Sequence, residues 1–120
     1  MIPTQNGWWQ EFRNDSTYVY RGQYSNGKKE GYWIYFYPNG KIQKQGDFIN
    51  GNMTSWWQEY NEQGNLIYEG QYSNGIKYGY SKSYKNGILQ SEGKYISGRQ
   101  RGTWKYYDEL GKMMKIQEHD

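Results

Sequence analysis

The hexapeptide Gly-Gln-Tyr-Ser-Asn-Gly occurs twice without change, at residues 22–27 and again at residues 70–75. Related hexapeptides stand between and after these copies, at residues 46–51 (Gly-Asp-Phe-Ile-Asn-Gly) and 93–98 (Gly-Lys-Tyr-Ile-Ser-Gly). The first glycines of successive copies are 24, 24 and 23 residues apart. A fixed period of this length indicates a repeat architecture, in which each unit is one small supersecondary element.

A second motif recurs in the other half of each period, where a Gly-x-Trp triplet, or a variant with Ser at its first or third position, is followed three residues later by an aromatic residue. The chain also begins within a repeat, because the same motif starts at Gly7 and leads into Gly22 at matching offsets. We therefore predict a single repeat domain over residues 1–120. It comprises a half repeat at 7–21 and four full units, at 22–45 (first), 46–69 (second), 70–92 (third) and 93–115 (fourth).

Turn signals separate the two halves of every unit. Asn-Gly is the dipeptide that most strongly favours a tight β-hairpin turn, because both residues tolerate positive φ, and it stands at 6–7, 26–27, 39–40, 50–51, 74–75 and 86–87. Consecutive hairpins without long crossovers predict an all-β fold, an elongated antiparallel meander of about ten short strands with no significant helix. At about 4.8 Å per strand, the slab would be about 45 to 50 Å long.

The composition fits a thin sheet better than a thick globule. The chain of 120 residues contains 15 Tyr, 6 Trp and 3 Phe but no Cys, and its net charge is only +3. Apolar burial must therefore come mostly from rings packed on rings and on glycines, and disulfides are excluded. Low charge together with a fifth of the residues aromatic also argues against a disordered chain.

Alternation along the second strand of each unit places glycines among rings. Tyr20, Gly22 and Tyr24 share one face by the two-residue period, and the same holds around Gly70. We expect a ring from the neighbouring strand to lie over the bare backbone of each such glycine. Trp33 and Phe36, three residues apart in the other strand, require either rings on both faces or a bulge between them.

The pattern Gly-x-Trp-x-x-Tyr, turn Gly, x-Leu, then Gly-x-Tyr-x-Asn-Gly resembles the MORN repeat variant found in tandem in bacterial YwqK-type antitoxins. The resemblance covers about residues 7–113 and implies a meander of hairpins without catalytic activity. It also implies a binding role, toward a cognate toxin or, for MORN repeats broadly, toward membranes and scaffolds. The sequence departs from the pattern at Ser81 in place of Trp, at Ser55 and Ser16 in place of Gly, and by one missing residue in 79–87.

Enzymatic chemistry lacks its usual residues here. His119 is the only histidine, and its position next to the C-terminus predicts a frayed tail, so neither a catalytic triad nor a His-based metal site is expected. Most carboxylates stand singly, and no helix follows a glycine-rich loop to hold phosphate. We therefore expect no catalytic residue, no metal and no cofactor. Nucleic acid is not expected either, because clustered bases occur in one unit only.

One aromatic column recurs at the position before the tryptophan of each unit. Its members are Trp8, Tyr32, Trp56 and Tyr80, and the series stops at Thr103. The column either fills the packed face of the slab or forms an exposed ladder suited to protein binding. The turn cations Lys28, Lys29, Arg99 and Arg101 are further candidates for partner contacts.

These features predict a non-enzymatic binding module. The first hypothesis is a cytoplasmic antitoxin or immunity protein with a cognate toxin as its protein partner, because the N-terminal residues show no export signal. The second is a membrane-surface or scaffolding module, which a polybasic face would favour but which this sequence lacks. The third is a carbohydrate binder that stacks sugars on its aromatic side chains.

Overall fold

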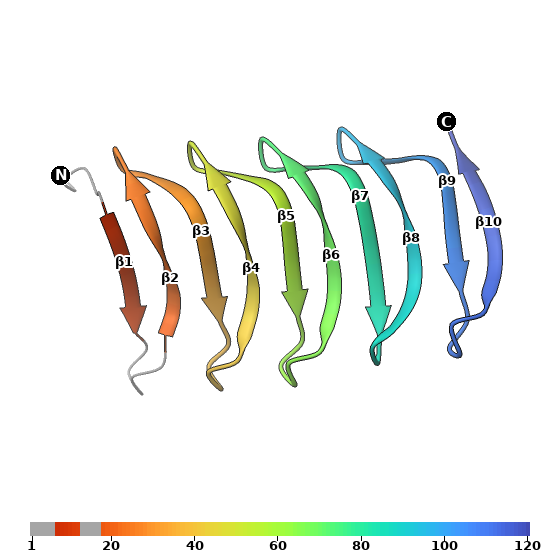
Figure 1. The fold of residues 1–120 in the computed structure, drawn as a ribbon, viewed down its shortest axis with the longest axis horizontal. Coiled ribbons are helices and arrows are strands. Elements are labelled where there is room, and N and C mark those ends of the chain that lie inside the picture. The colour runs from red at the N-terminus through yellow and green to blue at the C-terminus, as the bar shows by residue number, and fades with distance from the viewer. Residues whose placement is uncertain (1–6, 13–17) are drawn as a thin grey trace.

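The computed structural model describes residues 7–12 and 18–120 and contains one ten-stranded antiparallel sheet (Figure 1). The strands lie side by side in chain order, β1 to β10, and the slab measures 52 × 31 × 18 Å, with its long axis across the strands. The predicted all-β meander is thus confirmed. Within the described ranges there is no helix that could cross a membrane. Residues 1–6, which suggested a cytoplasmic location, and residues 13–17, which include Ser16, lie outside those ranges.

The strands are six to ten residues long. They are β1 (Gly7–Phe12), β2 (Tyr18–Ser25), β3 (Lys28–Phe36), β4 (Ile42–Ile49), β5 (Asn52–Tyr60), β6 (Leu66–Ser73), β7 (Ile76–Lys85), β8 (Ile88–Ile96), β9 (Arg99–Tyr107) and β10 (Met113–His119).

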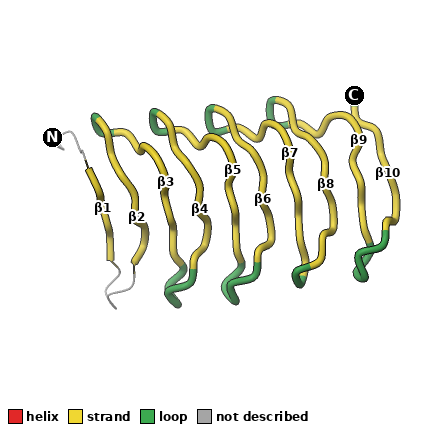
Figure 2. The backbone as a smooth tube through the Cα atoms, viewed as in Figure 1, coloured by secondary structure: helices red, strands yellow, loops and turns green. Residues whose placement is uncertain are grey.

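Two kinds of turn alternate along the sheet (Figure 2). At the upper edge in Figure 2, two-residue turns such as Asn26-Gly27 have positive φ at both residues, 51° and 77°, as the Asn-Gly signal predicts. At the lower edge the loops are longer: the Gly40 amide donates to the Tyr37 carbonyl, and the Tyr37 amide donates to the Lys41 carbonyl. The residue missing from the third unit converts one lower loop into a tight turn at Asn86-Gly87, again with positive φ at both positions.

A bulge with a left-handed residue recurs in the first strand of every unit. Between β2 and β3 the pairing passes from Arg21–Ile34 to Gln23–Glu30, so three residues of β3 face Gly22. Gly31 begins this stretch with φ +68°. The residue equivalent to Gly31 in the second unit is Ser55, with φ +59°, a conformation that a side chain adopts only at a cost. The repeat therefore imposes its backbone even where the glycine is missing.

The core is a row of tryptophans on glycines, all on one face of the sheet. Trp33 and Trp57 are fully buried and Trp104 is 3% exposed. A Cβ added to Gly22 would lie 2.1 Å from the Trp33 indole, and Gly46 and Gly93 stand in the same relation to Trp57 and Trp104. Tyr24 and Phe48 pack against the Trp33 ring with centroids 5.1 and 5.9 Å away. The predicted ring over bare glycine is present in these units.

The prediction fails at Gly70, because Ser81 replaces the tryptophan. The nearest atom to an added Cβ at Gly70 is the Tyr68 hydroxyl oxygen, at 2.5 Å, and Tyr68 belongs to the same strand as the glycine. Ser81 is buried and donates a hydrogen bond to that hydroxyl over 2.7 Å. The side chain over Gly70 is thus not a cross-strand ring but a tyrosine reaching along its own strand.

Of the two alternatives raised by Trp33 and Phe36, rings on both faces is the one present. The β3–β4 pairing does shift between Tyr35 and Phe36, but the extra residue is Gln43 of β4, so Trp33 and Phe36 stay on opposite faces. Rings also occupy the second face of the sheet, where hydroxyls at the positions equivalent to Phe36 contact polar side chains on that face: Tyr60 with Gln45, Tyr84 with Glu69 and Tyr107 with Glu92.

Candidate functional site

The four aromatic side chains of the column are exposed. Trp8, Tyr32, Trp56 and Tyr80 keep 67, 45, 37 and 57% of their surface accessible. Each precedes in sequence the residue at the tryptophan position, and successive residues of a strand point to opposite faces. The column therefore lies on the face opposite the packed tryptophans, and the interpretation that it fills the packed face is wrong. We call this second face the ladder face.

The pairing between strands fixes which side chains share the ladder face. Trp8 pairs with Gln23, Tyr32 with Asp47 and Trp56 with Gln71, and paired residues point to the same side of a sheet. The four rings sit on alternate strands, β1, β3, β5 and β7. Neighbouring rings are thus about 10 Å apart along the slab. The result is a regular row of amphipathic rings running across the strands, with polar residues between them.

Glu69 anchors one ring of the ladder. Its Oε1 accepts a hydrogen bond from Trp56 Nε1 at 2.9 Å and one from Gln58 at 3.5 Å, and its Oε2 accepts one from the Tyr84 hydroxyl. Burial by itself would raise the pKa of Glu69, but these hydrogen bonds, together with Lys82, hold that pKa below its ordinary value. Glu69 is therefore charged near neutrality and fixes the orientation of the Trp56 indole.

The tyrosine–glutamate hydrogen bond of Tyr84 and Glu69 recurs one unit later. One unit earlier, a glutamine replaces the glutamate. The Tyr107 hydroxyl donates to Glu92, and this hydrogen bond raises the pKa of Tyr107. Gln45 occupies the carboxylate position in the first unit and donates to the Tyr60 hydroxyl of the second unit over 2.9 Å. Each unit is in this way joined to the next by a hydrogen bond on the ladder face.

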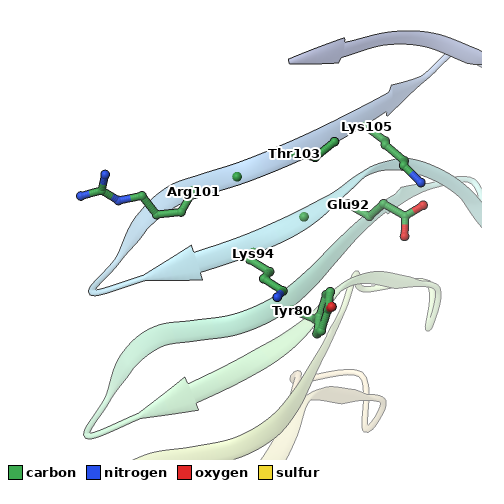
Figure 3. A pocket seen from close by; sticks show the side chains of 8 residues that line it. Tyr80, Glu92, Lys94, Arg101, Thr103 and Lys105 are labelled. Atoms are coloured by element: carbon green, nitrogen blue, oxygen red, sulfur yellow. The ribbon is translucent and has the colours of Figure 1, made fainter. Parts of the chain in front are cut away.

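Two hollows flank Tyr80 on the ladder face. One, of about 400 Å³, lies on the Trp56 side and is also lined by Gln71 and Lys82. The other, of about 350 Å³, lies on the fourth-unit side (Figure 3). Its lining side chains come from β7, β8 and β9: Tyr80, Glu92, Lys94, Arg101, Thr103 and Lys105. We call this second hollow the basic cavity.

The four turn cations do not form one patch. Lys28 and Lys29 lie on β3 and Arg99 and Arg101 on β9, with five strands between them. The Lys29 ammonium lies on the packed face, 5.1 Å from the Trp33 ring centroid, and donates to the Tyr35 hydroxyl. It therefore shields the core and is not part of the ladder face. Of the four cations, Arg101 lines the basic cavity.

Sequence reasoning missed Lys94, which lies over the Tyr80 ring at 4.9 Å from its centroid. The signal was available in the repeat, because Lys94 follows the glycine of its unit as Asp47 follows Gly46. Comparing that position among units, rather than looking for clustered bases, would have found it.

His119 is not in a frayed tail, contrary to the sequence prediction. It ends β10, and its ring meets Trp104 edge to face with centroids 6.4 Å apart. Its Nε2 is buried and has no hydrogen-bond partner among the residues that the structure describes. Those residues also contain no group of three or more His, Cys, Asp or Glu side chains placed to hold a metal ion.

Comparison with known families identifies the repeat. The family described as MORN repeat variant matches residues 29–50, 57–74 and 100–120, which together are half of the chain. A search of curated proteins finds no match to this sequence.

Proposed function

This chain belongs to the MORN repeat variant family, and from that premise we propose that it is a non-enzymatic binding module whose ladder face holds a protein partner. MORN repeats generally bind proteins and are typically non-catalytic. The proposal assigns partner contacts to Trp8, Tyr32, Trp56 and Tyr80.

The observation that carries the proposal is the exposure of four aromatic rings in a fold that is otherwise short of apolar area to bury. Only three large apolar side chains of the described residues are buried, all of them tryptophans of the packed face. Each exposed ring leaves apolar surface in water that could have been packed, at about 25 cal/mol per Å². Exposed Tyr and Trp are the side chains that most often dominate binding energy at protein interfaces.

For the partner itself we propose a cognate toxin that the module neutralises by covering its active site in the cytoplasm. The support is the resemblance of the repeat to YwqK-type antitoxins. A rigid slab that presents its rings in a fixed row also suits a tight inhibitor, because little side-chain entropy is lost on binding.

Adjacent tryptophans of β5 provide a matched test. Trp56 lies on the ladder face and Trp57 in the core. The product of the neighbouring reading frame is expressed alone and with the wild-type chain, and growth and co-purification are measured. Trp56→Ala and Tyr32→Ala should lose rescue and weaken binding by about 2 kcal/mol each while remaining folded. Trp57→Ala should lose both functions only by unfolding.

Other outcomes would direct the function elsewhere. If the wild-type chain sediments with phosphatidylserine vesicles and Trp56→Ala and Tyr32→Ala do not, the chain is a membrane-surface module instead. A change in tryptophan fluorescence on one member of a glycan panel would indicate a carbohydrate binder. Normal toxin binding by folded Trp56→Ala and Tyr32→Ala would remove the ladder from the interface.

A further inference from the structure

Three cations of the ladder face gather in the fourth unit. Lys94 on β8 and Arg101 on β9 are paired across the strands, and Lys105 on β9 pairs with Glu92. All four residues line the basic cavity (Figure 3). Three cations and one carboxylate give this cavity a net charge of about +2, two-thirds of the +3 carried by the whole chain.

The repeat itself does not require these cations, as the equivalent positions of the other units show. The position of Lys94 holds Gln23, Asp47 and Gln71 in the first, second and third units. That of Arg101 holds Glu30, Thr54 and Tyr78, and that of Lys105 holds Ile34, Gln58 and Lys82. The same backbone thus forms with neutral or acidic side chains at eight of these nine positions, Lys82 being the exception. The fold therefore does not need the positive charge of the fourth unit, which is available for binding a partner.

Some polar groups of the cavity already form hydrogen bonds within the protein, and others do not. The Glu92 carboxylate accepts the Tyr107 hydroxyl, and the Thr103 hydroxyl donates to Glu118. Arg101 and Lys105 have no side-chain hydrogen bond or ion pair to another residue in the described ranges. The cavity thus holds two cations without a side-chain partner in the described ranges, whereas the carboxylates of Glu92 and Glu118 are already hydrogen-bonded.

We propose that the basic cavity binds carboxylate side chains of an acidic segment of the protein partner, next to the Tyr80 ring of the ladder. This inference rests on the proposed function and adds the partner's chemistry and orientation. A guanidinium and two ammonium groups offer several charge-assisted hydrogen bonds to carboxylates. Toward the N-terminal half the ladder face carries Glu30 and Asp47 together with Arg21 and Lys28, so this half offers an acidic segment no net attraction. The partner is therefore oriented with its acidic end over the fourth unit.

A protein fits this surface better than a polyanion such as nucleic acid. A phosphate backbone needs positive charge along its whole path, with one charge for every few ångströms of strand. The cations of the basic cavity occupy one unit of the slab, and at the three equivalent positions of the unit before it only Lys82 is basic, beside Gln71 and Tyr78. A segment with a few carboxylates at one end and apolar or neutral residues along the rest matches that distribution.

The units themselves supply the variants for a test. Lys94→Asp, Arg101→Thr and Lys105→Gln together place the residues of the second unit in the fourth. The reciprocal triple, Asp47→Lys, Thr54→Arg and Gln58→Lys, builds a second basic cavity. The probe is a short fluorescein-labelled peptide of Glu, Asp and Ser, and its control has every Glu and Asp replaced by Gln and Asn. Fluorescence anisotropy gives both affinities, and denaturant midpoints confirm folding.

The acidic peptide should bind wild type at least about ten-fold more tightly than its amide control, a difference of about 1.4 kcal/mol. The fourth-unit triple should abolish that preference, the reciprocal triple should increase it, and added salt should weaken it. Equal binding of both peptides, or an unchanged preference in the fourth-unit triple, would overturn the proposal. So would tighter binding of oligothymidine or of phosphatidylserine vesicles at equal charge.

The two proposals fail in different ways. If folded Trp56→Ala still rescues growth from the toxin, the ladder is not the interface, whatever the peptide shows. If the fourth-unit triple rescues as well as wild type and Trp56→Ala does not, the ladder is the interface and the basic cavity takes no part in it.

Discussion

The second and third units reach the same backbone with different interiors. In the second unit the Trp57 indole lies over Gly46 and donates from Nε1 to the Asp47 carbonyl over 2.9 Å. In the third unit the equivalent residues are Ser81 and Gly70, and no indole is present. Tyr68 reaches over Gly70 instead, and the Lys77 ammonium lies 4.3 Å from the centroid of the Tyr68 ring.

This comparison shows that strand pairing, and not the buried ring alone, maintains the backbone of each unit. Strands β6, β7 and β8 keep the antiparallel order and register of the rest of the sheet although the tryptophan is missing. A large rigid ring and a smaller hydrogen-bonded pair fill equivalent places. We expect them to respond very differently to substitution.

The largest difference should come from removing the residue over the glycine. Trp57→Ala should lower the free energy of unfolding by about 3–5 kcal/mol, because it empties a fully buried site. Ser81→Ala should cost about 1 kcal/mol, because it removes only the hydrogen bond to Tyr68. Urea denaturation of both variants measures the gap, and equal losses would show that the two units have equivalent cores.

Replacing the covered glycine with a larger residue should produce a smaller difference in stability between the two units. Gly46→Val sets a Cβ about 2.3 Å from the Trp57 indole, whose buried ring cannot move away, so we expect a cost of about 1–3 kcal/mol. At Gly70 the nearest atom is the hydroxyl end of Tyr68, which can rotate aside. Gly70→Val should therefore be less destabilising than Gly46→Val in thermal unfolding. The reverse order would mean that the Tyr68 contact is the more rigid one.

The second and third units also differ at the left-handed bulge residue, where we expect a smaller difference in stability. Ser55 in the second unit has φ +59°, whereas Gly79 in the third has φ +89°. Ser55→Gly should relieve a backbone strain of about 1–2 kcal/mol, but glycine also loses more chain entropy on folding. The net prediction is that Ser55→Gly raises the free energy of unfolding by about 0.5 kcal/mol. Gly102→Ser, at φ +67° with open space around its Cα, should destabilise by a similar amount. A neutral result for both would remove the argument from strain.

The smallest effect concerns acid stability. The lowered pKa of Glu69 contributes stability that is present above the ordinary value near 4.5 and is lost as the pH falls through the folded-state pKa. Glu69→Gln copies Gln45, the equivalent residue of the first unit, and should make stability less dependent on pH in this range. Tyr84→Phe should raise the pKa of Glu69 and have a partial effect of the same sign. Denaturant midpoints measured from pH 6 downward compare the three proteins, and parallel curves would contradict this role.

Part of the candidate site could be derived from the sequence. The column of Trp8, Tyr32, Trp56 and Tyr80 follows from the repeat period alone. Its exposure did not, because the period does not say which of two adjacent aromatic positions, Tyr32 or Trp33, covers the glycine of the neighbouring strand. The basic cavity was not foreseen either, since Lys94 and Arg101 are seven residues apart and meet only across a hairpin.

The architecture follows from the repeat pattern, because a period of 23–24 residues with Asn-Gly turns allows consecutive hairpins and little else. An aromatic core follows as well, because few aliphatic side chains are available. The way each glycine is covered, by Trp57 at Gly46 and by Tyr68 at Gly70, emerges only in the folded chain. Such coverage depends on bulges and side-chain directions that bring distant atoms together, and local propensity carries no information about them.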